Sequence, residues 1–403
     1  MKRVVAFCGL SGLSMVAAHA APAPSWVATW SASPDSTLPT LAGTTVREAI
    51  RTSVGGTEVR LELSNVNGTG PVTLGPVRVA QRADGAAIVP GSDHAVMFHG
   101  QPTVTLAKGG TATSDPVAMT VSPWQALAVS IHVGDGAGAT TAHGVGNQTA
   151  WIAKGDATGD AAFPVQEKVS SRLFLTGVDV APGTSGYAIA VLGDSISDGV
   201  GSTPDTDARW PDDLASALQH TAGMNNVAVL DEGVAGNRVL HDEHLPFIGP
   251  SALTRLDADA LNKPGVRYVV LLEGINDISA SSYFPGTPDD VTAQQIIDGM
   301  KTIVARAHAR KVKVIGATLL PFDGLEWPFH SADGEAKRQA VNAWIRNGHA
   351  FDGVVDTDKA LRDPAHPERL LAAYDSGDHL HPNDAGHKAI AAAFDIPVLF
   401  AKP

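Results

Sequence analysis

The fold of the second half of this 403-residue chain is indicated by the stretch YAIAVLGDSIS at residues 187–197. Its first six residues form a continuous apolar run, which is typical of a strand buried on both faces of a parallel sheet. Gly193 and Asp194 end the run, and Ser195 follows directly. Serine is a weak nucleophile until a neighbouring base takes its proton. A serine at the end of a buried strand is therefore a candidate nucleophile, provided that the chain supplies a base.

A base and a carboxylate partner occur near the C-terminus, in the segment DHLH at residues 378–381. His381 could accept the serine proton. Asp378 could hold the imidazole in one tautomer and stabilise the imidazolium that forms. Pro382 disfavours a helical conformation for the residue before it, so we expect His381 on a loop, ahead of a helix that begins near Asn383. The chain thus contains the three parts of a nucleophilic hydrolase triad.

Two further segments, GVAGN at 233–237 and GIND at 274–277, also follow apolar strand-like runs. Acyl transfer passes through a tetrahedral intermediate whose oxyanion needs preorganised hydrogen-bond donors. The backbone N–H groups of Ser195 and Gly236 and the side-chain amide of Asn276 are neutral donors. Glycine also lets the backbone approach a substrate without a Cβ in the way. We therefore expect these three residues to form an oxyanion hole.

Residues 186–403 alternate apolar strands with helical segments, and we expect them to form the catalytic domain. The clearest helix spans 291–310, with its apolar residues on one stripe. This alternation predicts an α/β fold, a parallel sheet covered on both faces. Ligands bind beyond the carboxyl ends of the strands in such sheets, so one edge could collect the serine and the donors. The predicted strands are 188–192, 227–230, 268–272, 312–315 and 354–355.

Residues 25–182 have a different pattern. Short β-branched segments, such as the alternating TEVRLEL at 57–63, are separated by turn signals such as Asn67-Gly68. Strands of this length and spacing predict an all-β sandwich or jelly-roll domain. We expect it to be an accessory domain that precedes the catalytic one.

The N-terminus has the features of a secretory signal peptide. Lys2 and Arg3 precede a mostly apolar segment that ends in AHA at 18–20, a small-x-small cleavage pattern. We expect residues 1–20 to be removed after Ala20, and the mature protein to be secreted or periplasmic. Cys8 is the only cysteine, so the mature chain would depend on its core rather than on disulfides for stability.

The charge and composition exclude some classes of partner. A formal net charge of −13 argues against nucleic acid or an anionic membrane surface as a partner. No later apolar run is long enough to span a bilayer. The predicted chemistry needs neither a metal nor a cofactor. The sequence leaves the oligomeric state open.

Together these segments resemble the SGNH (GDSL-type) hydrolase family, and in particular its secreted bacterial two-domain members. The resemblance implies a flavodoxin-like three-layer fold with Ser195 as the nucleophile. It also implies Gly236 and Asn276 as oxyanion donors and Asp378 with His381 as the rest of the triad. The GVAG segment departs mildly from the more usual GISG, which leaves the donor glycine in place. The stretches that carry the resemblance are 26–33, 51–65, 209–212, 236–238 and 374–383.

The resemblance implies a secreted serine carboxylic-ester hydrolase that acts through an acyl-enzyme. We expect short, acetyl-type acyl esters as substrates, including those on glycans, because a β-sandwich beside the catalytic domain is compatible with carbohydrate recognition. Two alternatives remain open. One is a lysophospholipase or lipase-type hydrolase, and the other is a non-catalytic glycan-binding protein on a hydrolase scaffold. The β domain could bind glycan or only support the catalytic domain.

Three acidic or basic residues lie next to the candidate site. His379 is expected to point away from His381 if the loop is extended. Asp194 is expected to be a turn or support residue rather than a second catalytic acid. Asp277 is expected to orient or cap the loop that carries Asn276.

The roles of other residues near these motifs can be interpreted in two ways. His241 and His244 have the spacing of a metal pair, but no third ligand is evident and the chemistry requires none. Arg209 and Trp210 could shape a pocket or pack at the start of a helix. Arg238 could meet an anionic substrate group or pair with a nearby acid.

Overall fold

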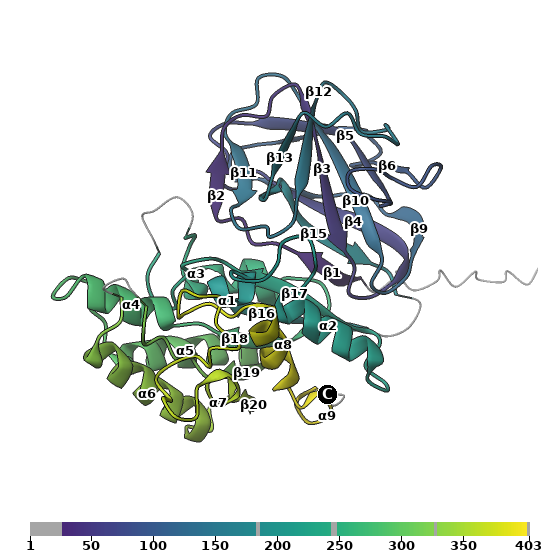
Figure 1. The fold of residues 1–403 in the computed structure, drawn as a ribbon. Helices are drawn as coiled ribbons and strands as arrows, with labels where there is room; N and C mark the ends of the chain where they lie inside the picture. Colours follow the sequence, from purple (N-terminus) through teal and green to yellow (C-terminus); the bar gives the residue numbers. More distant parts are fainter. Residues whose placement is uncertain (1–25, 183–185, 243–247, 326–328, 401–403) are drawn as a thin grey trace, which may run out of the picture.

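The computed structural model describes residues 26–182, 186–242, 248–325 and 329–400. The expected signal peptide at residues 1–20 lies outside the described residues. Figure 1 shows an antiparallel, strand-rich part in purple to teal stacked on an α/β part in teal to yellow. This arrangement confirms the predicted fold class, an α/β domain preceded by a β-sandwich.

The strand-rich part contains two facing antiparallel sheets. One has the order β1-β15-β4-β8, with β9 also paired to β4, and the other has the order β13-β12-β3-β10-β5-β6, with β7 also paired to β5. A small third sheet has the order β14-β11-β2. The strands are β1 (Val27–Ser31), β2 (Ser36–Leu38), β3 (Thr44–Arg51), β4 (Gly56–Ser64), β5 (Val72–Gln81), β6 (His94–Val96), β7 (Val104–Leu106), β8 (Thr111–Thr113), β9 (Val117–Val121), β10 (Ala126–Val133), β11 (Thr140–His143), β12 (Ala150–Lys154), β13 (Glu167–Val169), β14 (Arg172–Leu173) and β15 (Leu175–Val180).

The alternating pattern of β4 explains how this part buries its core. Val59, Leu61 and Leu63 are fully buried, whereas the residues between them are partly exposed. Because successive side chains of a strand point to opposite faces, one face of β4 lies on the core. The same core includes Val46 and Val129 of the facing sheet.

The α/β part is built on a parallel sheet with the order β17-β16-β18-β19-β20. All seven residues of β16 are buried, as its uninterrupted apolar run predicted. The register aligns Gly193 with Gly233 on one side and with Leu272 on the other. The loops that follow β16, β17 and β18 therefore leave the same edge of the sheet. The strands are β16 (Tyr187–Gly193), β17 (Val227–Gly233), β18 (Val266–Leu272), β19 (Lys313–Ala317) and β20 (Gly353–Val355).

Helices cover both faces of this sheet (Figure 1). Helices α2 and α8 contact each other, and α4 and α5 both contact α6. The predicted helix at 291–310 is observed as α5, shortened because Thr292 is its N-cap and forms a capping box with Gln295. The helices are α1 (Ser195–Asp198), α2 (Trp210–His220), α3 (Ala252–Leu256), the π-helical turn η1 (Asp257–Leu261), α4 (Ile275–Tyr283), α5 (Ala293–Ala309), α6 (Ala332–Asn347), α7 (Thr357–Leu361), α8 (Asp384–Ala392) and α9 (Ile396–Leu399).

The two parts share a buried boundary. Strand β1 contacts β17, and Ala228 and Leu230 of β17 belong to the core of the sandwich. Buried hydrogen bonds cross the same boundary: Ser53 Oγ donates to the carbonyl oxygen of Val229 at 2.8 Å, and Ser33 Oγ lies 2.6 Å from Glu232 Oε2. The sandwich is therefore packed on the edge of the parallel sheet. Nowhere in the described ranges does a helix combine the length and apolarity needed to cross a bilayer.

Candidate active site

Ser195 lies at the start of α1, directly beyond the buried strand β16. Asp194 is the N-cap of this short helix, and its Oδ1 accepts a hydrogen bond from the N–H of Ile196 at 2.9 Å. Gly199 ends the helix with a φ of 98°, a left-handed conformation that favours glycine. The tight turn from strand to helix places the serine at the edge of the sheet. Asp194 thus supports the turn that carries Ser195.

Ser195, His381 and Asp378 form a continuous chain of hydrogen bonds. Ser195 Oγ lies 2.8 Å from His381 Nε2, and His381 Nδ1 lies 2.6 Å from Asp378 Oδ2. The second carboxylate oxygen of Asp378 accepts the N–H groups of Leu380 and His381 at 3.0 and 2.8 Å. Burial raises the pKa of Asp378, but the bonds from the His381 ring and the two N–H groups outweigh this and hold the pKa well below its ordinary value. An ionised Asp378 can therefore stabilise an imidazolium at His381.

The loop that carries His381 is held from both sides. The carbonyl oxygen of His381 accepts the N–H of Ser376 at 3.0 Å, and Asn383, the N-cap of α8, donates to the carbonyl oxygens of Ala373 and Asp375. The histidine lies ahead of this helix, as Pro382 predicted. These contacts hold the loop, and the bond from Nδ1 to Asp378 Oδ2 orients the imidazole ring.

Asn276 lies in the first turn of α4, not on the expected loop, and Gly236 lies on the loop after β17, at the same edge of the sheet. Asn276 Nδ2 donates to the carbonyl oxygen of Asn237 at 2.9 Å, which uses one of its two N–H groups. Gly236 has a φ of 78°, which a side chain would strain. Among the described residues, no acceptor takes the backbone N–H of Gly236 or of Ser195. These donors can therefore meet an oxyanion without first breaking a bond to another described residue.

Asp277 ties the Asn276 helix to the loop after β17. Its two carboxylate oxygens accept the N–H groups of Val239 and Leu240 at 2.8 and 3.1 Å. Burial raises the pKa of Asp277 to about 6, although these hydrogen bonds oppose the rise. Asp277 thus links the start of α4, which carries Asn276, to the loop that carries Gly236.

Arg255 is a supporting residue that the sequence analysis missed. Its guanidinium donates to the carbonyl oxygens of Gly193 at 2.8 Å and Glu232 at 2.6 Å, and to Asn237 Oδ1 at 2.9 Å. It also lies 3.7 Å from the buried carboxylate of Glu273. It therefore links the ends of β16 and β17 with the loop after β17. No motif marks it, because its partners come from segments far apart in the sequence.

The histidine next to the triad has a partner of its own. His379 Nδ1 lies 2.6 Å from Asp375 Oδ2, and Asp375 Oδ1 also accepts the N–H of His379. Half of the His379 side chain is exposed. The Asp375–His379 pair is thus separate from the Asp378–His381 pair that reaches Ser195.

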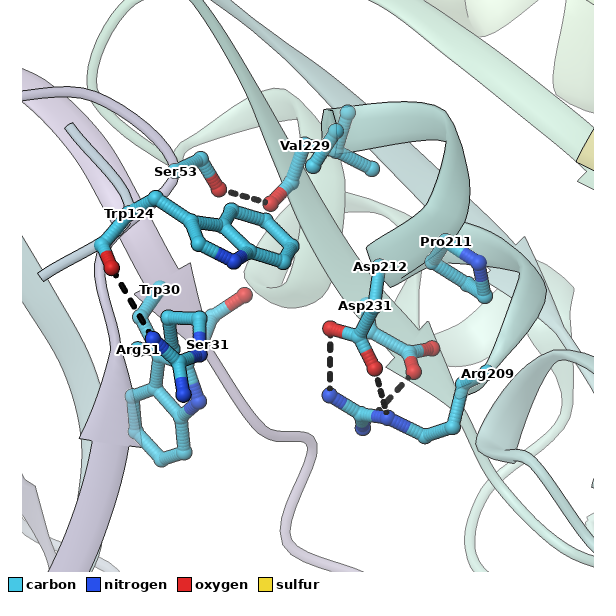
Figure 2. Close-up of a pocket in the computed structure, with 11 residues that line it drawn as sticks. Trp30, Ser31, Arg51, Ser53, Trp124, Arg209, Pro211, Asp212, Val229 and Asp231 are labelled. Atoms are coloured by element: carbon cyan, nitrogen blue, oxygen red, sulfur yellow. Dashed lines mark hydrogen bonds and ion pairs between the residues drawn. The ribbon is translucent and has the colours of Figure 1, made fainter. Parts of the chain in front are cut away.

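Arg209 and Trp210 pack at a helix start. Arg209 is the N-cap of α2, with Nε 2.7 Å from Asp212 Oδ2 and Nη1 2.9 Å from Asp231 Oδ2. Figure 2 shows these groups beside a cavity between the two parts of the molecule. Only about 20 Å³ of the cavity is open to a water-sized molecule, which is too little for a substrate. Trp210 is fully buried and stacks on Phe394 of the C-terminal segment.

The remaining candidates are placed as follows. Arg238 Nη1 pairs with Asp289 at 2.9 Å. His244, which has the spacing of a metal pair with His241, lies outside the described residues. Within the described part of the chain, no group of three or more His, Cys, Asp or Glu residues is arranged to hold a metal ion.

Comparison with known proteins places the α/β part in a known class. Residues 191–389 match the model of the GDSL-like lipase/acylhydrolase family. No curated protein matches the chain. Similar solved structures include a lipolytic protein of the G-D-S-L family from Desulfitobacterium hafniense (19% identity, TM-score 0.39, covering 52% of this chain and 97% of the other). Others are a carbohydrate acetylesterase from Sinorhizobium meliloti (15%, 0.42, 53% and 100%) and an aryl esterase from M. smegmatis (19%, 0.41, 53% and 100%).

Proposed function

Since this chain belongs to the GDSL-like lipase/acylhydrolase family and is a carboxylic-ester hydrolase, we propose that it cleaves esters through an acyl-enzyme formed on Ser195. The observation that carries the proposal is the hydrogen-bonded chain Ser195–His381–Asp378, with distances of 2.8 and 2.6 Å. Such a chain is what a serine needs to lose its proton as it attacks a carbonyl carbon.

In the acylation step, Ser195 Oγ attacks the ester carbonyl carbon while His381 Nε2 takes the hydroxyl proton. Asp378 stabilises the imidazolium. The carbonyl oxygen becomes an oxyanion, which accepts hydrogen bonds from the N–H groups of Ser195 and Gly236 and from the Asn276 side chain. The intermediate then expels the alkoxide, which takes the proton from His381 and leaves as an alcohol.

The second step releases the acid. Water attacks the acyl carbon, and His381 Nε2 takes one of its protons. The same donors hold the second oxyanion. Collapse of this intermediate returns the proton to Ser195 and releases the carboxylic acid.

We propose that the substrates are esters of short acyl groups, above all acetyl esters, including those on glycans. Ile248 supports this choice because it lies against the expected oxyanion donor: a methyl group added to Gly236 would come within 3.2 Å of Ile248 Cγ1. An apolar side chain packed on the glycine that carries the expected donor supports a small acyl group.

The purified protein would be assayed with p-nitrophenyl esters of graded chain length, acetylated xylan and a lysophospholipid. We expect the acetate ester to have the highest kcat/KM. Ser195→Ala should abolish turnover, whereas Ser197→Ala, in the same turn, should not. A fluorophosphonate should label the wild type at Ser195. Faster turnover of long-chain esters or of the lysophospholipid would instead favour a lipase-type hydrolase, and labelling at Ser197 or Ser202 would overturn the nucleophile.

We also propose that residues 1–20 direct export, and that the mature protein consists of a β domain at 25–182 and a catalytic domain at 186–403. The basic start, the apolar segment and the AHA pattern at 18–20 support the first part. N-terminal sequencing of protein recovered outside the cytoplasm should find Ala21 as the first residue. An intact Met1 on that protein would contradict cleavage.

A further inference from the structure

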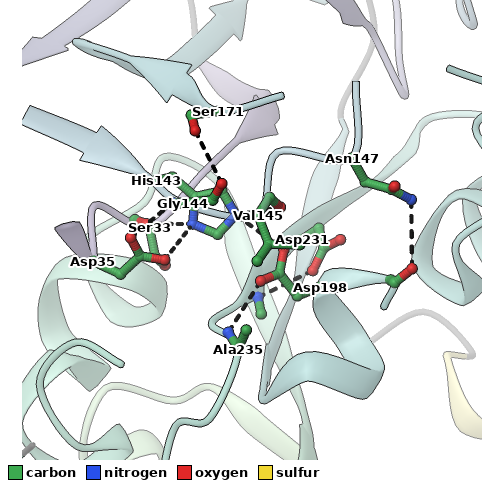
Figure 3. Close-up of polar contacts among 12 residues, drawn as sticks. Ser33, Asp35, His143, Gly144, Val145, Asn147, Ser171, Asp198, Asp231 and Ala235 are labelled. Atoms are coloured by element: carbon green, nitrogen blue, oxygen red, sulfur yellow. Dashed lines mark hydrogen bonds and ion pairs between the residues drawn. The ribbon is translucent and has the colours of Figure 1, made fainter. Parts of the chain in front are cut away.

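His143, at the end of β11 in the sandwich, reaches across to the helix that carries Ser195 (Figure 3). Its Nε2 lies 2.9 Å from Asp198 Oδ1 and 3.0 Å from the carbonyl oxygen of Val145. Its Nδ1 lies 2.8 Å from the carbonyl oxygen of Ser33 and 3.1 Å from Asp35 Oδ2. The side chain is almost completely buried.

The four partners of this ring fix its protonation. Carbonyl and carboxylate oxygens only accept hydrogen bonds, so each ring nitrogen needs a hydrogen of its own. A neutral imidazole would point one lone pair at two oxygens. His143 is therefore an imidazolium.

The nearby charges agree with this protonation. Burial lowers the pKa of His143, but Asp198 and Asp35 outweigh burial and raise it well above its ordinary value. Glu48 and Arg172 are also close to the ring, and burial raises the pKa of Glu48 to about 7 although the positive charges of Arg172 and His143 oppose the rise.

Asp198 connects this imidazolium to the segments that carry the two expected backbone donors, Ser195 and Gly236. It is the last residue of α1, three residues after Ser195, and it is buried. Its Oδ2 accepts the N–H of Ala235 at 3.0 Å, the residue before Gly236. One carboxylate thus holds the helix that presents the Ser195 N–H and the loop that presents the Gly236 N–H.

We propose that His143 is a positioning residue for ester hydrolysis: its imidazolium holds Asp198, and through Asp198 it fixes the N–H groups of Ser195 and Gly236 relative to each other. The sandwich then completes the catalytic site rather than only flanking it. This inference rests on the proposed function, since it assigns a purpose to the two donors.

The cost of losing the imidazolium follows from burial. A buried carboxylate without a cationic partner is strongly destabilised, so Asp198 would take up a proton or turn toward water. In either case its bond to the Ala235 N–H weakens. The donors then shift, and a misplacement of about 1 Å can cost about 10²-fold in rate.

The test uses His143→Leu, Asp198→Asn and the double variant, with Thr149→Ala as the control. Thr149 also bridges the two parts, through Asp205 at 2.7 Å, but it does not contact Asp198. We expect His143→Leu to lower kcat on p-nitrophenyl acetate about 10²-fold with little change in KM. In the double variant, the uncharged amide that replaces the Asp198 carboxylate can still accept the Ala235 N–H, so kcat should be higher than in His143→Leu. Thr149→Ala should keep the wild-type kcat.

A wild-type kcat in His143→Leu would overturn the inference, as would a loss confined to KM or a loss equal to that of Thr149→Ala. If His143→Leu does not fold by circular dichroism, Asp35→Asn takes its place, because it removes one carboxylate that holds Nδ1 and should lower kcat in the same way to a smaller extent. An unchanged kcat in Asp35→Asn would then overturn the inference. A wild type without Ser195-dependent hydrolysis would reject the proposed function itself, which separates the two failures.

Discussion

At the scale of the residue, the site combines one ionised carboxylate with neutral donors. Asp378 accepts three hydrogen bonds and keeps its negative charge. Gly236 and Asn276 are uncharged. In the free enzyme, a neutral donor can lie beside Ser195 without the desolvation cost of a buried charge. It stabilises charge only when the oxyanion develops, so its contribution belongs to the transition state.

Replacement of Asn276 tests this division. Asn276→Ala removes one of three donors, and we expect kcat to fall about 10²–10³-fold, about 2.7–4 kcal/mol. KM should change little, because the amide faces charge that appears late. Steady-state kinetics on p-nitrophenyl acetate measure both constants. A loss confined to KM would make Asn276 a substrate-binding residue and move the oxyanion hole elsewhere.

The two histidine–aspartate pairs make matched variants. Asp378→Asn leaves the imidazole of His381 without the carboxylate that stabilises its charged form, and we expect kcat to fall about 10⁴-fold. Asp375→Asn and His379→Ala alter a pair that does not contact Ser195 and should keep most of the rate. An inactive His379→Ala variant with an intact fold would mean that the triad has to be redrawn around the other pair.

At the scale of the element, the sequence predicted the strands and the helix that local periodicity determines. The five parallel strands and α5 are found where apolar runs and a helical stripe indicated them, and each shifts by only a few residues at its ends. The supporting residues could not be predicted in this way. His143 and Arg255 bind carbonyl oxygens and carboxylates from several separate segments, and no local pattern encodes such partners.

The N-cap of α5 gives a prediction about stability alone. Thr292 accepts the N–H of Gln295, and Gln295 in turn accepts the N–H of Thr292. Thr292→Ala should lower the free energy of unfolding by about 1 kcal/mol, without changing kcat. Thr302→Ala, on an exposed position of the same helix, is the control and should be neutral or slightly stabilising, since alanine favours helix. Denaturant unfolding measures both variants, and equal effects would refute a role for the cap.

At the scale of the whole molecule, the buried boundary between the sandwich and the sheet concentrates charge. Glu48, Asp198 and Glu232 lie fully buried close to this boundary, together with Arg255 and Lys263. Chains rarely bury so many charges unless they are paired. The pairs tie segments of the sandwich to the loops of the site, so folding of the two parts should be coupled.

The buried carboxyl groups of the molecule predict how its stability depends on pH. Burial raises the pKa of Glu48 to about 7 and of Asp277 to about 6. Between their unfolded values of about 4 and these folded values, the native state holds protons that the unfolded chain has released, so the free energy of unfolding falls as pH rises. The raised pKa of His143 acts in the same direction, because its contribution is complete below about 6.5 and is lost as pH rises through the folded value.

Asp378 contributes to the loss of stability in acid. Its lowered pKa contributes stability above about pH 4, and this contribution is lost as pH falls toward the folded value. The melting temperature at constant ionic strength should therefore be highest near about pH 4–5 and decline toward about pH 8. Glu48→Gln should flatten the decline between about pH 4 and 7, since glutamine keeps the oxygen that accepts the N–H of Leu173 but does not titrate. A melting temperature that rises from about pH 5 to 8 would show that the buried acids are already ionised in the native state and that their cationic partners outweigh burial. An unchanged slope in Glu48→Gln would show the same for Glu48 alone.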